Sequence, residues 1–290
     1  MSDVRIGISG WRYAPWRGDF YPKGLPQRRE LEFASREVNS IEINGSFYGL
    51  QTPERYSKWA EQTPDDFVFS VKAPRFITHV RRLVDIDEPL ANFFASGLLG
   101  LKEKLGPILW QFPPSFRFDE ELFAEFVAKL PANTDQARSH ARHASARLHV
   151  TGYLAATADR PLRHAVEIRN ASFCNPAFIK LLRRHGIALV VADTAGKWPY
   201  AEDITADFLY LRLHGDAELY VSGYSPQALQ HWHQRIETWT AGEQPADARL
   251  IDKTHKTSRT ARVLYCYFDN DVKVRAPYDA RDLQQRLQEE

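Results

Sequence analysis

Charged and amide side chains recur at the ends of the short apolar segments of this sequence. The segment AVEIR, residues 165–169, carries Glu167 and Arg169 two positions apart. Side chains two positions apart in a β-strand point to the same face, so this carboxylate and this guanidinium face one region. A buried charge is costly unless it is paired or solvated. The pair therefore indicates either a structural ion pair or part of a polar site.

Six other segments end in the same way, with groups that can transfer a proton or bind a polar substrate. The candidate catalytic residues are Glu42, Lys72, Glu167, Asp193 and His214. The candidate substrate-binding residues are Trp11, Asn44, Tyr48, Gln111, Arg169, Arg212, Tyr267, Asp269 and Asn270. Among these, Arg169 and Arg212 are suited to bind an anion through two hydrogen bonds each. A Schiff base at Lys72 is a further alternative.

The charges of this set nearly balance, which bears on cofactors. Three carboxylates face three cations: Glu42, Glu167 and Asp193 against Lys72, Arg169 and Arg212. A divalent-metal site normally has an excess of carboxylate and histidine ligands, and only one strand-end histidine is present. We therefore predict no cofactor, with a divalent metal left open. The expected ligand is a small polar or anionic compound with hydroxyl, carboxylate or phosphate groups.

Two loops that follow strands are rich in aromatic residues. Residues 10–26 and 45–53 contain Trp11 and Tyr48 next to the strand ends, where an aromatic ring can cover a pocket. The alternative is a small apolar cluster that holds each loop closed. We expect His79 to be structural and Cys174 to be an inert thiol.

The elements that must position these residues alternate along the chain. Strands are predicted at 4–9, 40–44, 67–73, 107–112, 163–169, 187–193, 208–214 and 262–268. Helices are predicted within 25–37, 53–63, 86–105, 119–130, 175–186 and 225–242. This alternation predicts an α/β fold, a single (β/α)8 TIM-barrel-like domain over residues 1–290. The carboxyl ends of the strands of such a barrel meet at one rim, where active sites form.

Two segments are additions to this pattern. Residues 133–162 and 245–261 each precede a strand, so we expect them at the end of the barrel opposite the rim. Their basic residues are expected to be solvated. Residues 194–207, between the sixth and seventh strands, are expected to be mostly irregular.

Composition excludes several classes of protein. Hydrophobic residues make up 43% of the 290 residues and the net charge is +1, so no global positive field attracts nucleic acid or membranes. We expect no membrane span and no signal peptide. Two widely spaced cysteines, Cys174 and Cys266, favour a reducing, cytoplasmic setting.

The chain also resembles a known family, the DUF72 (YecE-like) proteins. The segments that carry the resemblance are GISGWRYAPWRGDFYPKGLP, SIEINGSFYGL, SVKAPRFITH, ILWQFPPSF, AVEIRNASF, VVADTAG, YLRLHG and YCYFDND, in family order. The resemblance implies a TIM barrel, related in shape to sugar isomerases and apurinic-site endonucleases. It implies no particular reaction.

Three functions are compatible with these observations. The first is an enzyme of hydrolase, lyase or isomerase type that uses acid–base chemistry at the rim. The second is a nucleic-acid-processing barrel, in which loop cations meet phosphates: Arg12, Arg17, Lys23, Arg75, Arg81 and Arg82. The third is a small-molecule-binding protein without catalysis. The oligomeric state is not determined by the sequence.

Overall fold

Eight parallel strands close into a barrel in the order in which they occur along the chain. The computed structural model describes residues 4–146, 148, 158–254 and 259–289. The strands are β1 (Val4–Ser9), β2 (Ser40–Ile43), β3 (Val68–Lys72), β4 (Leu105–Gln111), β5 (His164–Glu167), β6 (Ala188–Asp193), β7 (Phe208–Leu213) and β8 (Val263–Phe268). Since β1 pairs with both β2 and β8, the barrel is closed. The predicted α/β barrel fold is confirmed.

Helices surround the barrel. They are α1 (Glu30–Glu37), α2 (Gly45–Tyr48), α3 (Pro53–Gln62), α4 (Asp87–Ala95), α5 (Glu120–Ala128), α6 (Thr134–Ala141), α7 (Pro176–His185), α8 (Pro226–Thr240) and α9 (Arg275–Arg286). Shorter helical segments are η1 (Ala14–Trp16), η2 (Gln27–Arg29), η3 (Phe76–Val80), η4 (Leu98–Lys104) and η5 (Ala171–Phe173). Each of the six predicted helical segments contains a helix. Helix α9 was not among the predicted elements.

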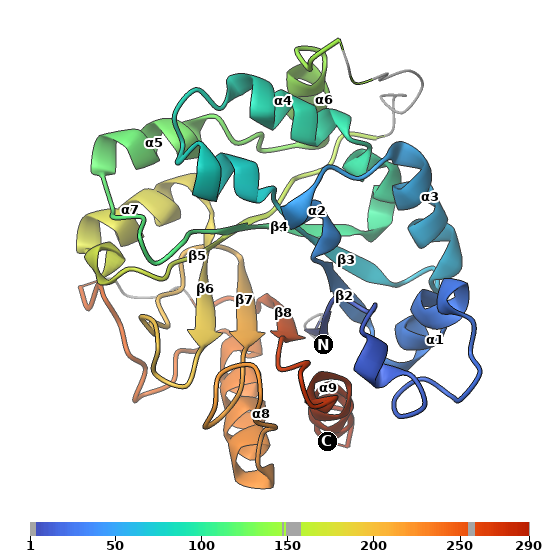
Figure 1. The fold of residues 1–290 in the computed structure, drawn as a ribbon. Coiled ribbons are helices and arrows are strands. Elements are labelled where there is room, and N and C mark those ends of the chain that lie inside the picture. The colour runs from blue at the N-terminus through green and yellow to red at the C-terminus, as the bar shows by residue number, and fades with distance from the viewer. Residues whose placement is uncertain (1–3, 147, 149–157, 255–258, 290) are drawn as a thin grey trace.

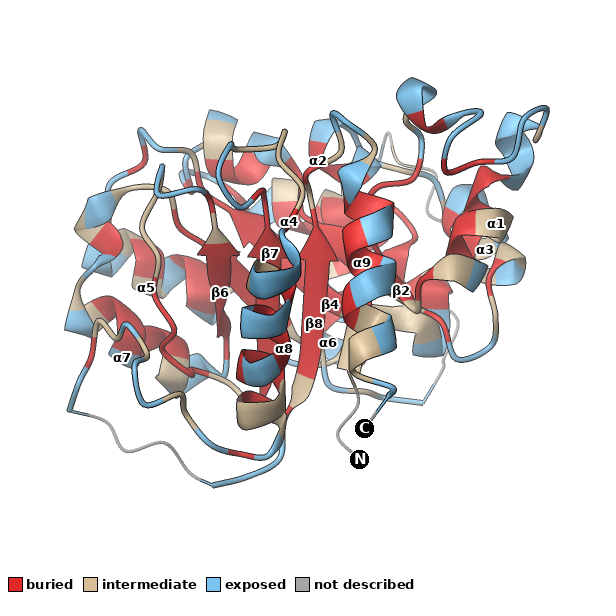
Figure 2. Cartoon of the chain, turned by 90° about the horizontal axis from the view of Figure 1, so that it is seen from below, coloured by how far each residue is buried: buried red, intermediate tan, exposed pale blue. Residues whose placement is uncertain are grey.

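The longer helices cover the outside of the barrel, whereas the short α2 lies near its mouth, beyond the carboxyl ends of the strands (Figure 1; Figure 2). In side view, the strands are buried and each helix turns a buried face toward them and an exposed face outward (Figure 2). Strand β1 begins and helix α9 ends at the end of the barrel opposite the strands' carboxyl ends (Figure 2). Between β6 and β7, residues 194–207 form no helix, as the sequence indicated.

The predicted helix within 86–105 is divided in two. At Gly97 the backbone has a φ of 102°, a left-handed conformation that glycine adopts without steric cost. A Cβ at this position would lie 2.4 Å from the Cα of Pro53, the first residue of α3. The close approach of α3 therefore requires glycine here and ends α4 before η4 begins.

The interior of the barrel changes from apolar to polar along its axis. In the middle, Tyr210 and Tyr267 lie side by side with ring centroids 5.2 Å apart. Their hydroxyl groups lie 2.6 Å from Ser70 Oγ and 2.7 Å from Ser40 Oγ, respectively. Above this layer, at the carboxyl ends of the strands, charged side chains fill the interior. The carboxyl ends of the strands thus form a polar layer beneath the loops that follow them.

The additional segments pack on the outside. Helix α6 contacts α4, and Asn133 pairs with Pro161 in an isolated bridge, which joins the two ends of the first segment. In the second, the backbone N–H groups of Ile251 and Asp252 donate to the carboxylate of Asp203 at 2.7 and 2.9 Å. Residues 147, 149–157 and 255–258 of these segments lie outside the described residues.

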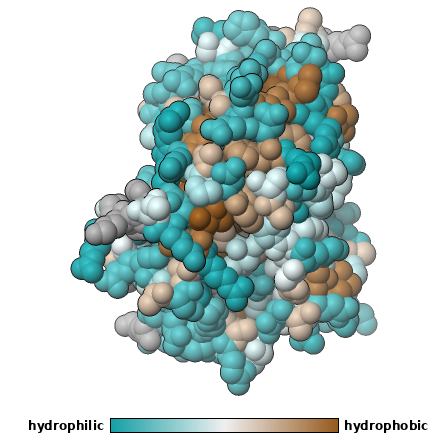
Figure 3. Space-filling model, turned by 90° about the vertical axis from the view of Figure 1, so that its left-hand side faces the viewer, coloured by the Kyte–Doolittle hydropathy of each residue, from teal (hydrophilic) through white to brown (hydrophobic). Residues whose placement is uncertain are grey.

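The described surface is mainly hydrophilic on the face that Figure 3 shows, with smaller apolar areas between the polar side chains. Among the described residues, no helix combines the length and the apolar character that a bilayer crossing requires.

Candidate active site

Arg212, on β7, stands at the centre of the polar layer and is completely buried. Its Nη2 donates to Glu42 Oε1 at 2.8 Å and to Asp269 Oδ2 at 2.9 Å, and its Nη1 donates to Glu167 Oε2 at 2.7 Å. One guanidinium thus bonds three carboxylates that come from β2, β5 and the end of β8. We call Arg212, Glu42, Glu167, Asp269 and Arg169 the Arg212 cluster.

Glu167 and Arg169 face the same region, as their spacing predicted. Arg169 Nε donates to Glu167 Oε1 at 2.8 Å, and Gln111 Nε2 donates to the same oxygen at 2.9 Å. Both oxygens of Glu167 are therefore occupied by donors. Burial alone would raise the pKa of Glu167, but Arg169 and Arg212 lower it well below its ordinary value.

The carboxylate of Asp269 is likewise kept ionised by cationic neighbours. Burial alone would raise its pKa, but Arg212 and His214 lower the pKa far below the ordinary value of an aspartate. His214 Nδ1 lies 3.0 Å from Asp269 Oδ2, and His214 Nε2 lies 3.4 Å from Arg212 Nη1. The histidine is thus part of the contact network around the guanidinium.

Glu42 contacts two hydroxyl groups in addition to Arg212. The Tyr210 hydroxyl donates to Glu42 Oε2 at 2.6 Å, and the Ser9 hydroxyl donates to Glu42 Oε1. Both donors come from the barrel strands β7 and β1. The sequence analysis did not select Ser9 or Tyr210, since a serine and a tyrosine within strands carry no distinctive signal.

Loop residues cover the outer side of the cluster. The Arg169 guanidinium lies 3.8 Å from the ring centroid of Trp198, and its Nη2 donates to the Tyr220 hydroxyl at 3.1 Å. A cation that contacts an aromatic face in this way is stabilised by the ring's quadrupole. Trp198 and Tyr220 follow β6 and β7, and neither was selected from the sequence.

Lys72 differs from the other charged residues of the polar layer. It is only 7% exposed. Its amine lies 4.3 Å from the ring centroid of Phe47, and in the described part of the chain it forms neither an ion pair nor a hydrogen bond. Burial, with Arg212 as the next cause, lowers the pKa of Lys72 from 10.5 to about 8.

Three candidate residues lie apart from the cluster. The Asp193 carboxylate accepts a hydrogen bond from the Tyr224 hydroxyl at 3.0 Å, and burial raises the pKa of Asp193. Tyr267 lies in the middle layer of the barrel, where Ser40 partners its hydroxyl. Asn270 Nδ2 donates to Asp279 Oδ2 at 2.7 Å, which ties the end of β8 to α9. None of these three side chains forms a hydrogen bond or ion pair with Arg212, although Tyr267 is its register partner on β8.

His79 and Cys174 have the surroundings of structural residues. The His79 ring lies 5.1 Å from Phe47, and burial, followed by Lys72, lowers the pKa of His79 to about 4. Cys174 is a free thiol in an exposed residue, and partial desolvation, followed by the charge of Asp203, raises its pKa, so it has no activated thiolate.

The aromatic loop residues divide into two groups. Trp16, Phe20 and Tyr21 are buried, and their rings contact one another in edge-to-face and tilted arrangements, which forms the small apolar cluster that was the alternative expectation. In contrast, Trp11 and Tyr48 line a cavity of about 600 Å³ beside the rim, together with Asn44.

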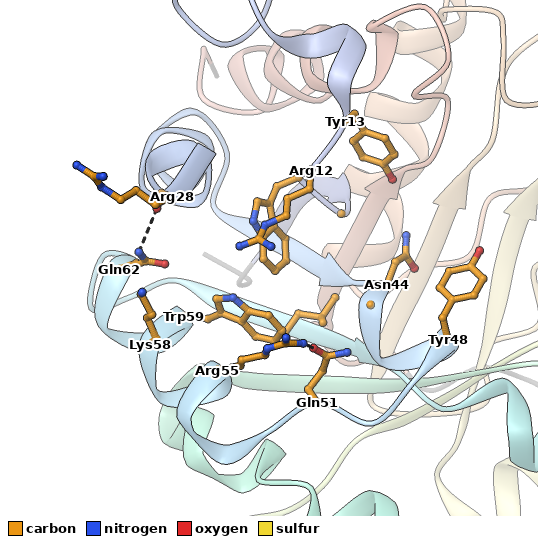
Figure 4. Close-up of a pocket in the computed structure, with 14 residues that line it drawn as sticks. Arg12, Tyr13, Arg28, Asn44, Tyr48, Gln51, Arg55, Lys58, Trp59 and Gln62 are labelled. Atoms are coloured by element: carbon orange, nitrogen blue, oxygen red, sulfur yellow. Dashed lines mark hydrogen bonds between the residues drawn. The ribbon is translucent and has the colours of Figure 1, made fainter. Parts of the chain in front are cut away.

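This cavity is lined by basic side chains that the sequence analysis mostly missed (Figure 4). We call it the basic pocket, and its cationic lining residues are Arg12, Arg28, Arg55 and Lys58. Only Arg12 was considered from the sequence. A spacing signal exists in α3, where Arg55, Lys58, Trp59 and Gln62 share one helical face.

Two of the other five loop cations proposed for nucleic-acid contacts form ion pairs within the protein. Arg17 forms an ion pair with Glu30 at 2.7 Å, and Arg81 forms one with Asp85 at 3.5 Å. In the described residues, no three histidine, cysteine or acidic side chains are arranged to hold a metal ion.

Comparison with known proteins places the chain in a family. The model of the family described as "Protein of unknown function DUF72" matches residues 5–290. The chain belongs to the DUF72 family. Curated relatives include UPF0759 protein YunF of Bacillus subtilis (strain 168), 32% identical over 126 residues, which cover 41% of this chain and 43% of YunF. UPF0759 protein YecE of Escherichia coli (strain K12) is 32% identical over 113 residues, which cover 39% of each protein.

Solved structures of DUF72 proteins have the same fold. TM1631 of Thermotoga maritima aligns with a TM-score of 0.74 at 24% identity and covers 99% of both chains. EF0366 of Enterococcus faecalis V583 aligns with a TM-score of 0.69 at 18% identity, over 98% of this chain and 95% of that chain. These similarities concern the barrel fold. The matched regions of YunF and YecE span about two fifths of those proteins.

Proposed function

We propose that this DUF72 protein is an enzyme that acts on a small polar, anionic compound by acid–base chemistry at the rim of the barrel. The observation that supports the proposal is the Lys72 amine, which lacks an ion-pair partner among the described residues although its side chain is largely buried and three carboxylates lie in the same polar layer. A pKa of about 8 leaves both protonation states of Lys72 populated near neutral pH. Such a group both accepts and donates protons efficiently.

The other ionisable groups are better suited to positioning. Glu167 is bonded to Arg169, Arg212 and Gln111 and has a lowered pKa, so it is a weak base. Arg212 is charged at every relevant pH. We assign these residues the role of a rigid frame beneath the reacting group.

His214 is the second candidate for proton transfer. It lies at the end of β7, 3.0 Å from Asp269, which can orient the ring. A base and an acid that face one compound support removal of a proton at one position and its delivery at another. This is the chemistry of an isomerase or a lyase.

Proton exchange in D₂O tests the proposal. Sugar phosphates, hydroxy acids and keto acids are incubated with the protein, and deuterium incorporation at carbon is followed by NMR. We expect one class of compound to exchange, and we expect Lys72→Met to reduce that rate by about 100-fold or more. The matched control is Lys180→Met, which changes an exposed lysine of α7. Full exchange activity in Lys72→Met, with the fold retained, would contradict the proposal.

A second measurement does not depend on the substrate. Reductive methylation with ¹³C-formaldehyde labels each lysine, and the NMR shifts are then followed against pH. We expect the signal that disappears in Lys72→Met to titrate near pH 8, below the ordinary range of a lysine amine. A Lys72 signal that titrates near 10 would remove the basis for assigning it proton transfer.

A further inference from the structure

We infer that the basic pocket is a binding site for the phosphate group of a small phosphorylated compound. The first observation is its charge. Its lining includes Arg12, Arg28, Arg55 and Lys58 and no carboxylate. In the described part of the chain, none of these four side chains forms an ion pair. Four cations around one cavity repel one another unless an anion joins them.

The second observation is that parts of this pocket are held in place before any ligand binds. Arg55 Nη1 donates to Gln51 Oε1 at 3.0 Å, and Gln62 Nε2 donates to the backbone carbonyl of Arg28 at 3.2 Å. The first contact orients a guanidinium, and the second fixes η2 against α3. Because arginine presents its donors in a planar fork that matches phosphate oxygens, this arrangement favours phosphate over a simple halide.

The third observation is an aromatic wall beside the cations. Trp11 and Trp59 are 6% and 8% exposed, and their rings meet edge to face with centroids 5.2 Å apart. Two nearly buried indoles form a rigid apolar surface that suits the carbon skeleton of a ligand. The pocket therefore binds a phosphate ester better than free inorganic phosphate.

The position of the pocket connects it with the polar layer. Figure 4 shows Asn44 and Tyr48 at the side of the pocket next to the strands, with Arg28 and Lys58 on the opposite side. Asn44 directly follows β2, two residues after Glu42. A ligand that binds its phosphate on the cations can therefore extend along Asn44 toward the rim.

Gly10 lines the pocket at a point where the backbone requires glycine. Its N–H donates to the backbone carbonyl of Glu42 at 2.8 Å, and its φ of 80° is left-handed. A Cβ here would lie 2.9 Å from the Tyr13 hydroxyl, which itself donates to the Ser9 carbonyl at 2.5 Å.

The idea that the pocket binds part of a substrate rests on the function proposed above. As a phosphate site it can be tested independently.

The test compares the parent protein with Arg12→Gln/Arg55→Gln and with the matched control Lys180→Gln/Arg184→Gln, whose two cations are exposed on α7. The probes are phenyl phosphate, inorganic phosphate and uncharged phenol, measured by calorimetry and by tryptophan fluorescence at low salt. We expect saturable binding of phenyl phosphate, weaker binding of inorganic phosphate and none of phenol. The pocket variant should bind phenyl phosphate at least 10-fold more weakly, and the control variant should bind like the parent.

Three results would overturn the inference. They are no saturable binding of either phosphate probe to the parent, equal binding by the pocket variant, and binding of duplex or single-stranded DNA without binding of the monoester. Raising the salt concentration should weaken phenyl phosphate binding, because exposed charges are screened.

Lys72→Met separates this inference from the proposed function. If it loses proton exchange but binds phenyl phosphate like the parent, both proposals are supported. If it retains exchange while the pocket variant loses phosphate binding, the role of Lys72 fails and the phosphate site stands. If it loses exchange while the pocket variant binds phenyl phosphate normally, the phosphate site fails and the acid–base proposal stands.

Discussion

The Arg212 cluster and the basic pocket differ in how their charged side chains are partnered. In the cluster, one buried guanidinium bonds three carboxylates, and Arg169 bonds one of them again. In the basic pocket, four cations face a cavity of about 600 Å³ with no carboxylate in its lining. The cluster lies at strand ends, whereas the cations of the basic pocket lie on the loop after β1, on η2 and on α3.

The difference shows which charges are available to a ligand. Buried charges need partners inside the protein, because water cannot solvate them there. Exposed cations are solvated and can exchange water for a ligand oxygen at small cost to stability. Lys72 shares one feature with each region: its side chain is buried, as in the cluster, but it forms no ion pair among the described residues, as in the basic pocket. The four predictions below test this contrast.

The largest effect is expected for Arg212→Met. Its removal leaves the carboxylates of Glu42, Glu167 and Asp269 buried without their shared partner. We expect the free energy of unfolding at pH 7 to fall by about 3–5 kcal/mol, measured by urea denaturation. Arg184→Met on the surface of α7 is the control, with a change within about 0.5 kcal/mol. Equal stability of the two variants would show that the cluster is solvated rather than paired.

Glu167→Gln should cost about 2–3 kcal/mol, because it removes charge-assisted hydrogen bonds to Arg169 and Arg212. It should also change the dependence of stability on pH. The pKa of Glu167 is lowered in the folded state, so its contribution is present above the unfolded pKa and is lost as pH falls below about 5. The stability of the parent should therefore decline on acidification more steeply than that of the variant, by up to about 1.4 kcal/mol per pH unit. Parallel curves for the two proteins would contradict the pairing.

Lys72→Met should stabilise the protein. Because the pKa of Lys72 falls from 10.5 to about 8, its charged form is disfavoured in the folded state. The penalty is fully present below pH 8 and is released as pH rises toward 10.5. We expect a gain of about 2 kcal/mol at pH 7, smaller than the shift alone implies because the contact with Phe47 is lost. The gain should shrink between pH 8 and 10. A destabilised variant would indicate a partner for the amine.

The smallest effect is expected in the basic pocket. Arg55→Gln/Lys58→Gln removes two exposed cations that lie three positions apart on α3. The unfolding free energy should change by no more than about 0.5 kcal/mol, toward higher stability at low salt because like charges are removed. A loss of 2 kcal/mol or more, measured in the same urea series, would mean that these cations are structural.

The sequence was a good guide to the elements that form the barrel wall. Each strand is buried on both faces, so it appears as a short apolar run between turn residues. Helix α9 was missed because its signal is weak. It follows Val274, which has a φ of 57°, and it buries mainly small residues such as Ala276 and Ala280. Its buried positions Ala276, Ala280 and Leu283 follow helical spacing, but two of these three side chains are short, so the apolar face is less conspicuous than one made of leucines.

The sequence also located most of the polar layer, because a charged residue in a buried strand is unusual enough to identify. The sequence could not show that Asp193 lies apart from the cluster, because this is revealed only by the hydrogen-bond partner of its carboxylate. That partner, Tyr224, lies in the loop after β7. In the same way, the register places the hydroxyl of Tyr267 in the middle of the barrel, below the strand ends.

The basic pocket depended on tertiary structure throughout. Arg28, Arg55 and Lys58 read as ordinary exposed residues of a loop and a helix, and only the packing of α3 beside the β1 loop brings them together. The sequence by itself determined the alternation of strands and helices and the unusual charges at the strand ends, because both follow from local pattern. The tertiary structure decided which charges neutralise one another and which remain open to a ligand, because pairing depends on distances between residues far apart in the chain.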